Sequence, residues 1–207
     1  RGMIPQAARR HRVPFLYLNQ VGGNDELVFD GHAVVIGPGG ELLAAAPGFE
    51  EHLLAYDLES PRQLPTQAGV SDPLLSVSPE HLLFRALVLG TRDYCGKTGF
   101  KTALMGISGG IDSAVTAVIA AAALGPGQVA GVSMPGRYSS AHSKSDAYDL
   151  ARRLGIADLT VPMEGPFTAF SSTLNTAFRA RGRPILGATL PDLTEENLQS
   201  RIRGTIL

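Results

Sequence analysis

The run GISGGIDSA, from Gly106 to Ala114, contains the residue types that hold the phosphates of a nucleotide. Gly109 and Gly110 have no Cβ, so phosphate oxygens can approach the backbone closely at these two positions. The free N–H groups of a helical turn that starts there would point at the anion. Ser108 and Ser113 add two hydroxyl donors. The run therefore predicts a loop that binds the polyphosphate of a nucleotide.

The segments on both sides of the loop predict a strand before it and a helix after it. The apolar stretch 102–107 is typical of a buried strand, and the alanine-rich stretch 112–124 is typical of a helix that ends at Gly125. Further along, residues 128–134 and 157–161 predict two more strands, with a helix over 140–154 between them. Strands that alternate with helices in this way indicate a parallel sheet.

The loop differs from two common nucleotide-binding motifs. A Walker A loop needs a lysine for the outer phosphates, and no lysine lies between Lys101 and Lys144. The dinucleotide fingerprint G-x-G-x-x-G has Ser108 where its second glycine belongs, and the next strand ends without an acidic residue for a ribose hydroxyl. Kinase-like γ-phosphoryl transfer and a Rossmann dehydrogenase are therefore disfavoured. The alternative without a ligand is a turn with a good helix cap, for which serine and aspartate are also favoured.

Composition narrows the classes of partner. The 207 residues include 44% hydrophobic residues, enough for a core, and 18 Lys+Arg against 19 Asp+Glu give a net charge of −1. This balance argues against a nucleic-acid partner. The single cysteine excludes an internal disulfide framework, which agrees with a cytoplasmic location, and no apolar run reaches membrane length. The chain begins without Met and stops inside a predicted helix, so we expect a segment of a longer protein.

Residues outside the central unit predict further elements. Residues 13–58 read as short antiparallel strands, with a hairpin around Pro38-Gly39-Gly40 and another strand at HLLAYDL, residues 52–58. Residues 60–79 are rich in Pro, Ser and Gln and predict a linker. Three more helices are expected. The first begins at Ser78-Pro79 and extends to Tyr94, with an apolar face of Leu82, Leu83, Ala86, Leu87 and Gly90. The second begins at Pro166, with an apolar stripe of Phe167, Phe170, Leu174 and Phe178. The third begins at Thr194, after a loop over 181–192.

Three stretches of the chain together resemble one enzyme family. The S-G-G-x-D-S pattern resembles the pyrophosphate loop of the N-type ATP pyrophosphatases, which cleave ATP between its α and β phosphates and adenylate an acid. YLNQVGGNDELVFDG, residues 17–31, is similar to a segment near the end of the nitrilase-like amidase domain of glutamine-dependent NAD synthetases. TEENLQSRIRG, residues 194–204, resembles a third segment of the same enzymes. Because the three occur in the family's order, the chain is identified as a member of that family.

The resemblance implies a fold and a reaction. The fold class is α/β: the end of a nitrilase-like αββα sandwich over residues 1–59, a linker and connecting helix over 60–98, and the front of a Rossmann-like, parallel-sheet ATP pyrophosphatase domain over 99–207. In the family, the amidase domain releases ammonia from glutamine. The synthetase domain adenylates deamido-NAD with ATP and magnesium, and ammonia then displaces AMP. The family's catalytic Glu, Lys and Cys precede the YLNQVGG segment, so we assign no catalytic residue in this chain. Cys95 and His32 are interpreted as structural residues.

The resemblance also implies binding roles for particular residues. Those expected to bind ATP are Gly106, Ile107, Ser108, Gly109, Gly110, Ile111, Asp112, Ser113 and Met134. Asp112 would also ligate Mg²⁺, the alternative being a favourable charge at a helix N-terminus worth roughly 0.3–1 kcal/mol. At the carboxyl end of the strand over 128–134, Met134 and residues 135–140 are candidates to border adenine and ribose, and Met134 could equally fill the core. Asn197 and Arg201 match the deamido-NAD site, and the alternative for them is an exposed helix face.

The expected partners are small molecules, namely ATP, deamido-NAD and glutamine or ammonia, together with further copies of the chain in a homo-oligomer. Two alternatives stay open. One is another N-type ATP pyrophosphatase, such as GMP synthetase or the ammonia-dependent NAD synthetase, although neither has a nitrilase-type segment before the loop. The other is a nucleotide-binding fragment without catalytic activity.

Overall fold

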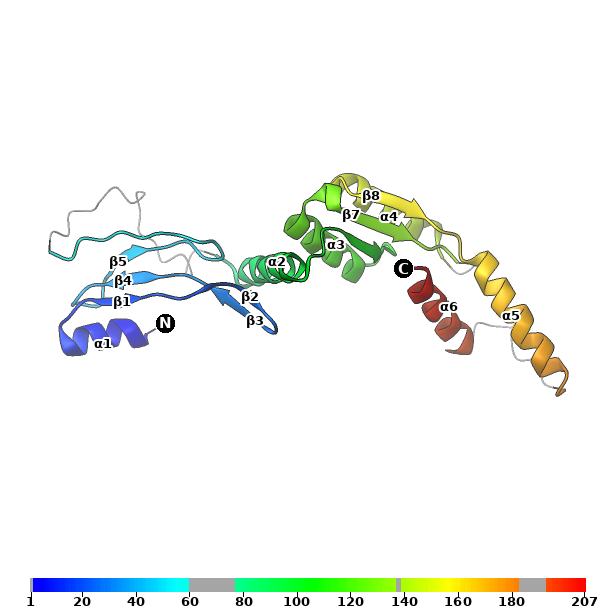
Figure 1. Cartoon of the computed structure of the whole chain (residues 1–207), viewed down its shortest axis with the longest axis horizontal. Coiled ribbons are helices and arrows are strands. Elements are labelled where there is room, and N and C mark those ends of the chain that lie inside the picture. The colour runs from blue at the N-terminus through cyan, green and yellow to red at the C-terminus, as the bar shows by residue number, and fades with distance from the viewer. Residues whose placement is uncertain (1, 60–76, 137–138, 183–192) are drawn as a thin grey trace. The chain divides into compact units, whose positions relative to one another are not determined.

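The computed structural model describes residues 2–59, 77–136, 139–182 and 193–207. The chain divides into two compact units, residues 1–99 and residues 100–207, and each is described by itself (Figure 1). The predicted linker over 60–79 and the predicted loop over 181–192 fall mostly outside the described residues.

The first unit contains short antiparallel strands. Three of them form a sheet in the order β1-β4-β5, and β2 and β3 pair separately as a hairpin. The predicted hairpin around Pro38-Gly39-Gly40 is confirmed as β4–β5, with the Gly40 N–H donating to the Gly37 carbonyl at 2.8 Å. The elements before residue 60 are α1 (Met3–His11), β1 (Phe15–Tyr17), β2 (Val21–Asn24), β3 (Leu27–Asp30), β4 (Val34–Ile36) and β5 (Leu42–Ala45).

One expectation for this unit is wrong, and two of its elements were not expected. The predicted strand HLLAYDL over 52–58 is wrong: the segment pairs with no described strand, and Leu53 is 92% exposed. Helix α1 was not anticipated, although Ala8 on it is fully buried and basic residues fill its last turn. The β2–β3 hairpin was also missed, because its two-residue turn, Asp25-Glu26, lacks the usual glycine and places Asp25 at φ 51°.

Helix α2 (Pro79–Thr98) begins where the sequence predicts. The Ser78 hydroxyl accepts from the His81 N–H at 3.3 Å, and Pro79 occupies the first turn. The pKa of Glu80 lies below its ordinary value, because hydrogen bonds from the backbone and from Ser78 stabilise the carboxylate. The helix continues four residues beyond Tyr94 and ends at Gly99, whose φ of 81° is one that glycine adopts without strain.

The face of α2 that packs on the first unit differs from the predicted one. Asp93 accepts the Gly23 N–H at 2.7 Å, and the Lys97 ammonium donates to the Gly23 carbonyl. A Cβ on Gly23 would lie 3.0 Å from the Cα of Gly90, so two glycines allow the helix to approach β2. Leu89 is buried, whereas Leu83 and Leu87 of the predicted apolar face are exposed. Helix α2, expected to connect two domains, is thus packed within the first unit.

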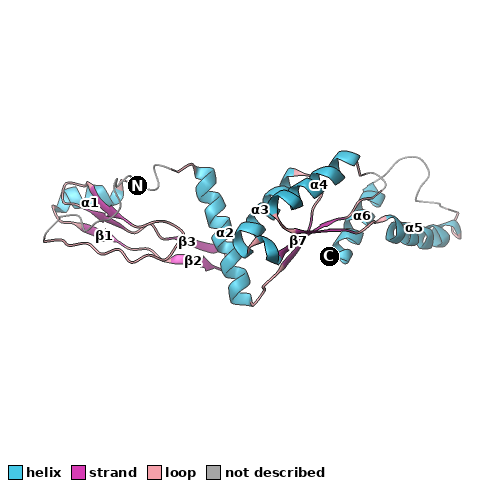
Figure 2. Ribbon diagram, turned by 90° about the horizontal axis from the view of Figure 1, so that it is seen from above, coloured by secondary structure: helices cyan, strands magenta, loops and turns pink. Residues whose placement is uncertain are grey.

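The second unit is built on the predicted parallel sheet, in the order β6-β7-β8. Its elements are β6 (Ala103–Gly106), α3 (Ile111–Leu124), a short 3₁₀ turn η1 (Pro126–Gln128), β7 (Val129–Ser133), α4 (Ala141–Leu154), β8 (Ala157–Thr160), α5 (Glu164–Arg179) and α6 (Leu193–Ile206). The predicted β-α-β-α-β order is therefore confirmed. Helices α3 and α4 lie beside each other (Figures 1 and 2).

Alternate residues of β7 bury their side chains in two different cores. Val129 packs with α3 and α4, where Ala117, Ala147 and Ala151 are almost fully buried. Val132 packs with residues of α5 and α6, including Phe167 and Ile202. Since side chains of a strand alternate between its faces, the helices cover both sides of the sheet. This sandwich of helices around a parallel sheet holds the C-terminal ends of the strands in place.

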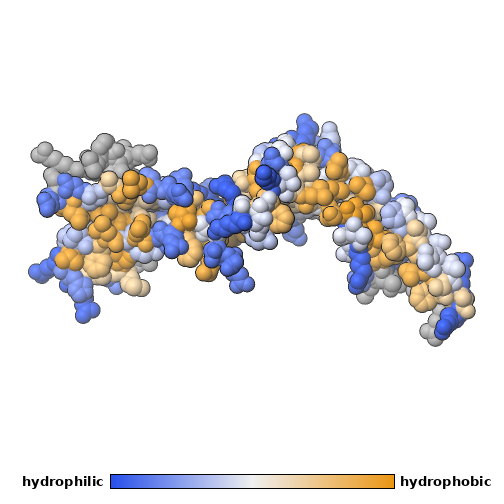
Figure 3. Space-filling model, viewed as in Figure 1, coloured by the Kyte–Doolittle hydropathy of each residue, from blue (hydrophilic) through white to orange (hydrophobic). Residues whose placement is uncertain are grey.

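Apolar surface remains exposed over the strands of both units (Figure 3). It includes Leu16 in the first unit and Leu104 and Leu159 in the second. The stripe predicted for α5 is also only partly buried. The helix begins two residues before Pro166, Phe167 is buried as expected, but Phe170 and Phe178 are exposed.

The cap of α2 gives a test of how this helix is anchored. Replacing Ser78 by alanine should lower the free energy of unfolding by about 1 kcal/mol, because the His81 N–H loses its acceptor. Ser78→Asn is the matched control and should stay within a few tenths of a kcal/mol, since asparagine caps as well as serine. Urea unfolding measures both, and an alanine variant as stable as the asparagine variant would contradict the role of the cap.

Candidate functional site

The glycine loop occupies the turn between β6 and α3, as the sequence predicts. Ile107 extends the sheet, its N–H donating to the Val132 carbonyl at 2.9 Å. The Ser113 hydroxyl donates to the Gly110 carbonyl at 2.9 Å and accepts from the Ser108 N–H at 3.2 Å. The Ser108 hydroxyl accepts from the Gly110 N–H at 3.3 Å. The two serines therefore fold the loop into one compact turn at the start of α3.

Gly109 is the residue at which the loop touches the neighbouring helix. Its φ is +75°, a region that residues with a Cβ rarely adopt. A Cβ here would lie 2.7 Å from the Ser143 carbonyl oxygen and 3.0 Å from the Ser143 Cα, both in the first turn of α4. The loop thus packs backbone against backbone on α4, and only glycine fits both requirements.

Asp112 lies exposed in the first turn of α3. The N-cap of the helix is Gly110, which has no side chain, so Asp112 lies in the first turn without capping it. Its carboxylate remains at the positive end of the helix, where it is open to a cation or to solvent. Asp146 of α4 also packs near the loop, its Cβ lying 3.2 Å from where a Cβ on Gly109 would be.

A cavity of about 530 Å³ begins where the loop leaves the sheet. It is large enough for a nucleotide, since ligand pockets typically span roughly 300–1,000 Å³. Its lining residues come from the loop, the end of β7, the start of α4 and the end of α6. They are Gly106, Ile107, Ser108, Ser133, Met134, Pro135, Ser139, Ser143, Arg203 and Leu207. The position at the carboxyl ends of parallel strands is where open α/β sheets bind ligands.

The structure brings some of the predicted site residues together and separates others. Gly106, Ile107, Ser108 and Met134 line the cavity. The remaining predicted ATP-binding residues form the adjoining turn and the start of α3: Gly109, Gly110, Ile111, Asp112 and Ser113. Met134 is also buried in the core beside α5 and α6.

Asn197 and Arg201 lie exposed on α6 and do not line the cavity. Arg203 does so instead. Two residues apart on a helix differ by about 200° in direction, so Arg201 and Arg203 point to nearly opposite sides. Leu198, Ile202 and Ile206 mark the core side of α6, but Arg201 and Arg203 flank Ile202 on its two sides, so the sequence alone does not distinguish them.

Two further lining residues follow the end of β7: Ser139, inside the segment 135–140 that was expected to border the nucleoside, and Ser143, which was not expected there. The Ser139 hydroxyl also accepts from the Gly136 N–H at 3.0 Å. Their signal was the short, serine-rich segment before α4, at the same sheet edge as the glycine loop. Among the described residues, no cluster of three His, Cys, Asp or Glu side chains is arranged for a metal ion.

Cys95 and His32 both belong to the first unit. Cys95 is a partly buried free thiol on α2. His32 is buried, with its ring edge-on to Phe49 at 5.7 Å between centroids. Arg85 stacks over the same Phe49 ring at 5.2 Å and donates to the Gly48 carbonyl at 2.6 Å. These contacts tie α2 to the strands and give His32 a place in the packing.

Comparison with known proteins gives the family. The model of the NAD synthase family matches residues 83–207. The chain belongs to the NAD synthase family. It is 46% identical over 199 residues to the glutamine-dependent NAD(+) synthetase of Rhodobacter capsulatus, a match that covers 94% of this chain and 34% of that protein.

Two solved structures resemble the chain to different extents. The glutamine-dependent NAD+ synthetase from Acinetobacter baumannii, solved in complex with adenosine diphosphate, matches 99% of this chain and 37% of that one, with a TM-score of 0.82 and 34% identity. The NH3-dependent NAD synthetase from Campylobacter jejuni matches 63% of this chain and 51% of that one, with a TM-score of 0.52 and 21% identity, which shows a shared fold alone.

This NAD synthase family chain spans about a third of the length of the glutamine-dependent relatives that it matches. Its described helices include none with the length and apolar character needed to cross a membrane.

Gly109 offers a test of the loop geometry. Gly109→Ala should lower the free energy of unfolding by at least about 1–2 kcal/mol, from the positive φ alone, with the contact to Ser143 adding to it. It should also weaken ATP binding, because the loop must move away from α4. Urea unfolding and calorimetric titration with ATP measure the two effects.

Gly96→Ala is the matched control for this substitution. Gly96 lies inside α2, and an added Cβ would meet no atom within 4 Å. Alanine should stabilise the helix there by roughly 0.5–1 kcal/mol and leave ATP affinity unchanged. Equal behaviour of the two variants would show that the Gly109 conformation is unimportant.

Proposed function

We propose that residues 100–207 bind ATP for cleavage between the α and β phosphates, as part of a synthetase that converts deamido-NAD to NAD. The observation that carries the proposal is the S-G-G-x-D-S turn placed directly beside a nucleotide-sized cavity at the carboxyl edge of the sheet. The family match supports it, as does the ADP bound in the Acinetobacter baumannii structure.

The residues of the loop would hold the outer two phosphates. The N–H groups at the start of α3 have no helical partners and point at the anion, and the helix dipole adds to their attraction. The loop contains no lysine of the kind that contacts the γ-phosphate during its transfer. The β and γ phosphates are therefore expected to leave together as pyrophosphate. A turn already folded by Ser108 and Ser113 need not reorganise when that charge develops.

Mg²⁺ fits the residues at this site. The ion is usually held by one or two carboxylates together with substrate phosphates, and Asp112 supplies an exposed carboxylate at the loop. When bound, Mg²⁺ would neutralise part of the phosphate charge. Asp112 is therefore proposed as its ligand from this part of the protein.

The remaining roles concern the whole synthetase. Ammonia from glutamine would displace AMP from the adenylated acid, and Asn197 and Arg201 would contact deamido-NAD from the exposed side of α6. We also propose that residues 1–59 end a nitrilase-like amidase domain, that 60–98 connect it to the synthetase domain starting at 99, and that the enzyme is a cytoplasmic homo-oligomer. Similarity to glutamine-dependent synthetases along 94% of the chain supports this organisation.

The alternatives predict different ligands. GMP synthetase and the ammonia-dependent NAD synthetase would share the ATP loop but not the first 58 residues, which the glutamine-dependent relatives match. A nucleotide-binding fragment without activity would bind ATP but not deamido-NAD. Calorimetric titration of the chain with ATP, and then with deamido-NAD, separates an NAD synthetase from GMP synthetase and from an inactive fragment.

The reaction class can be tested by its products. The synthetase that contains this chain should convert ATP to AMP and pyrophosphate in the presence of deamido-NAD and ammonia, as measured by nucleotide chromatography. ADP and orthophosphate as the products would contradict the proposal.

Asp112→Asn tests the metal ligand. In the chain itself, Mg²⁺ should strengthen ATP binding, and the variant should lose at least about tenfold of that gain, the lower end of what losing a supporting partner costs a metal site. Stability should change little, because Gly110 and not Asp112 caps the helix. Calorimetry with and without Mg²⁺ measures the effect, and an unchanged Mg²⁺ dependence would reduce Asp112 to a helix-dipole partner.

Glutamine hydrolysis gives a negative prediction. Amide hydrolysis by a thiol needs an activated nucleophile, and Cys95, the one cysteine of the sequence, lies on α2, beyond the residues that resemble the amidase domain. The 207-residue chain and its Cys95→Ala variant should therefore release equally negligible ammonia from glutamine. Activity that disappears with Cys95 would contradict the domain boundary proposed at residue 59.

A further inference from the structure

One side of α6 carries residues spaced by four: Glu195, Gln199, Arg203 and Leu207, the last directly after the helix. Side chains at this spacing are neighbours along a helix. Glu195 and Gln199 are buried and Arg203 is half-buried, although all three are polar. Polar side chains are placed in such surroundings when they have a partner or a ligand to contact.

This side of α6 borders the cavity at two points. The Gln199 Oε1 lies 3.3 Å, and the Arg203 Nη2 4.0 Å, from where a Cβ on Gly136 would be. Leu207 Cδ1 lies 3.5 Å from the corresponding position on Gly106, where the glycine loop begins. Arg203 therefore lies near the segment after β7, one turn before the residue that meets the start of the phosphate loop, and it lines the same cavity as Ser108.

The cavity has an electrostatic preference for an anion. Arg203 is the one charged side chain among its described lining residues, and it makes no ion pair with another described residue. The hydroxyls of Ser108, Ser139 and Ser143 are further donors in the lining. A guanidinium with its five N–H donors matches the oxygens of a phosphate in a bidentate arrangement.

The position of the cavity decides which phosphate reaches Arg203. The N–H groups that would hold the outer two phosphates belong to Gly109 and residues 111–113, since the Gly110 N–H donates to the Ser108 hydroxyl, and these residues do not line the cavity. The cavity meets the loop at Ser108. Along ATP, the group next to the outer two phosphates is the α-phosphate, followed by ribose and adenine. If the loop binds the outer two phosphates, the rest of the ATP molecule extends past Ser108 into the cavity. Its α-phosphate is then the first group inside the cavity.

We propose that Arg203 binds the α-phosphate of ATP and positions it for attack; this inference rests on the proposed function. In the reaction, a carboxylate oxygen of the acid substrate forms a bond to the α-phosphorus. The bond from that phosphorus to the bridging oxygen breaks, and pyrophosphate leaves with the electron pair. The guanidinium stabilises the charge on the α-phosphate oxygens as the new bond forms, and afterwards holds the adenylated acid.

A series of ligands that differ in their number of phosphates tests the contact between Arg203 and the α-phosphate. The 207-residue chain is titrated calorimetrically with adenosine, AMP, ADP and ATP. Arg203→Gln removes the charge but keeps a side chain that favours a helix. The variant should bind AMP, ADP and ATP more weakly by roughly 10- to 100-fold each, as expected for the loss of a hydrogen bond to a charged group. Adenosine should bind the two proteins equally.

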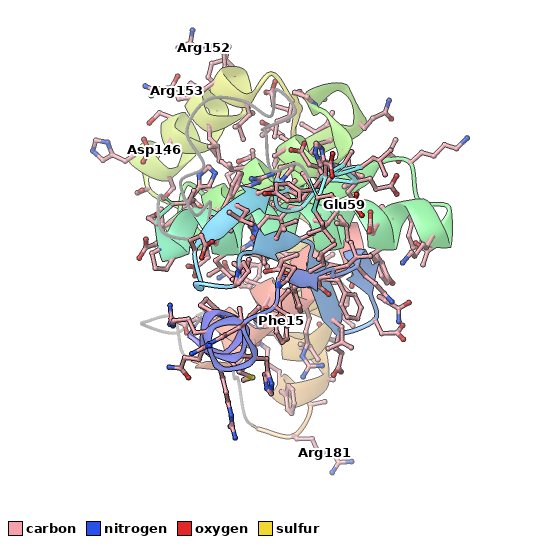
Figure 4. The ribbon with its side chains drawn as sticks, turned by 90° about the vertical axis from the view of Figure 1, so that its left-hand side faces the viewer. Phe15, Glu59, Asp146, Arg152, Arg153 and Arg181 are labelled. Atoms are coloured by element: carbon pink, nitrogen blue, oxygen red, sulfur yellow. The ribbon has the colours of Figure 1, made fainter. Side chains whose placement is uncertain are left out.

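Two further variants control the experiment. Arg203→Lys keeps the positive charge but lacks the planar guanidinium that binds phosphate in a bidentate arrangement, so it should recover part of the lost affinity. Arg153→Ala removes an arginine from the last turn of α4, where Arg152 and Arg153 project away from the ribbon (Figure 4), and should bind every nucleotide like the unmodified chain. Circular dichroism confirms that each variant is folded.

The outcomes separate the inference from the proposed function. Loss for all three phosphorylated nucleotides and none for adenosine supports the inference. If the Arg203→Gln variant lost as much affinity for adenosine as for the nucleotides, Arg203 would contact the nucleoside and not the phosphate. If its affinity for every ligand were unchanged, Arg203 would not belong to the site. Either result overturns the inference and leaves the proposed function standing. An unmodified chain that binds none of the nucleotides overturns both.

Discussion

The site depends on the close approach of two backbones, that of the glycine loop at Gly109 and that of the first turn of α4 at Ser143. The approach requires both a positive φ and the absence of a Cβ, which glycine alone provides without strain. It brings the beginnings of α3 and α4 together at the carboxyl edge of the sheet. One consequence is that serines from both segments, Ser108 and Ser143, line a single cavity.

The pairing of β6 with β7 fixes where the glycine loop begins. Residue pairs of β6 and β7 place Gly106 opposite Val132, so the loop leaves the sheet beside the point where β7 ends. A Cβ on Gly131 would lie 2.7 Å from the Ile107 Cδ1, so the missing side chain makes room for the residue that opens the loop. Small residues thus occur where chain segments must pass closely, and larger ones such as Met134 and Phe167 fill the core on the other face.

The sequence was sufficient to predict those parts of the site that depend on local chemistry. The strand, turn and helix around residues 106–113 follow from glycines, hydroxyls and apolar runs that are adjacent in the chain. The faces of α2 and α6 were harder, because their environment is set by contacts distant in sequence. Arg201 and Arg203 are equal in propensity and charge, and only packing of Ile202 against Met134 and Phe167 determines that Arg203 turns toward the cavity. The β2–β3 hairpin was missed because its turn has no glycine, and its contact with Asp93 spans 70 residues.

The central claim is that the glycine loop holds the outer two phosphates of ATP while the cavity holds the nucleoside end. A crystal structure of the chain with Mg²⁺ and an ATP analogue carrying a methylene bridge between its α and β phosphates tests it most directly. The account predicts β- and γ-phosphate oxygens on the N–H groups of Gly109 and residues 111–113, the α-phosphate within hydrogen-bonding distance of Arg203, and the purine inside the cavity. An analogue bound in the reverse direction, with its γ-phosphate in the cavity, or bound away from the loop would contradict it.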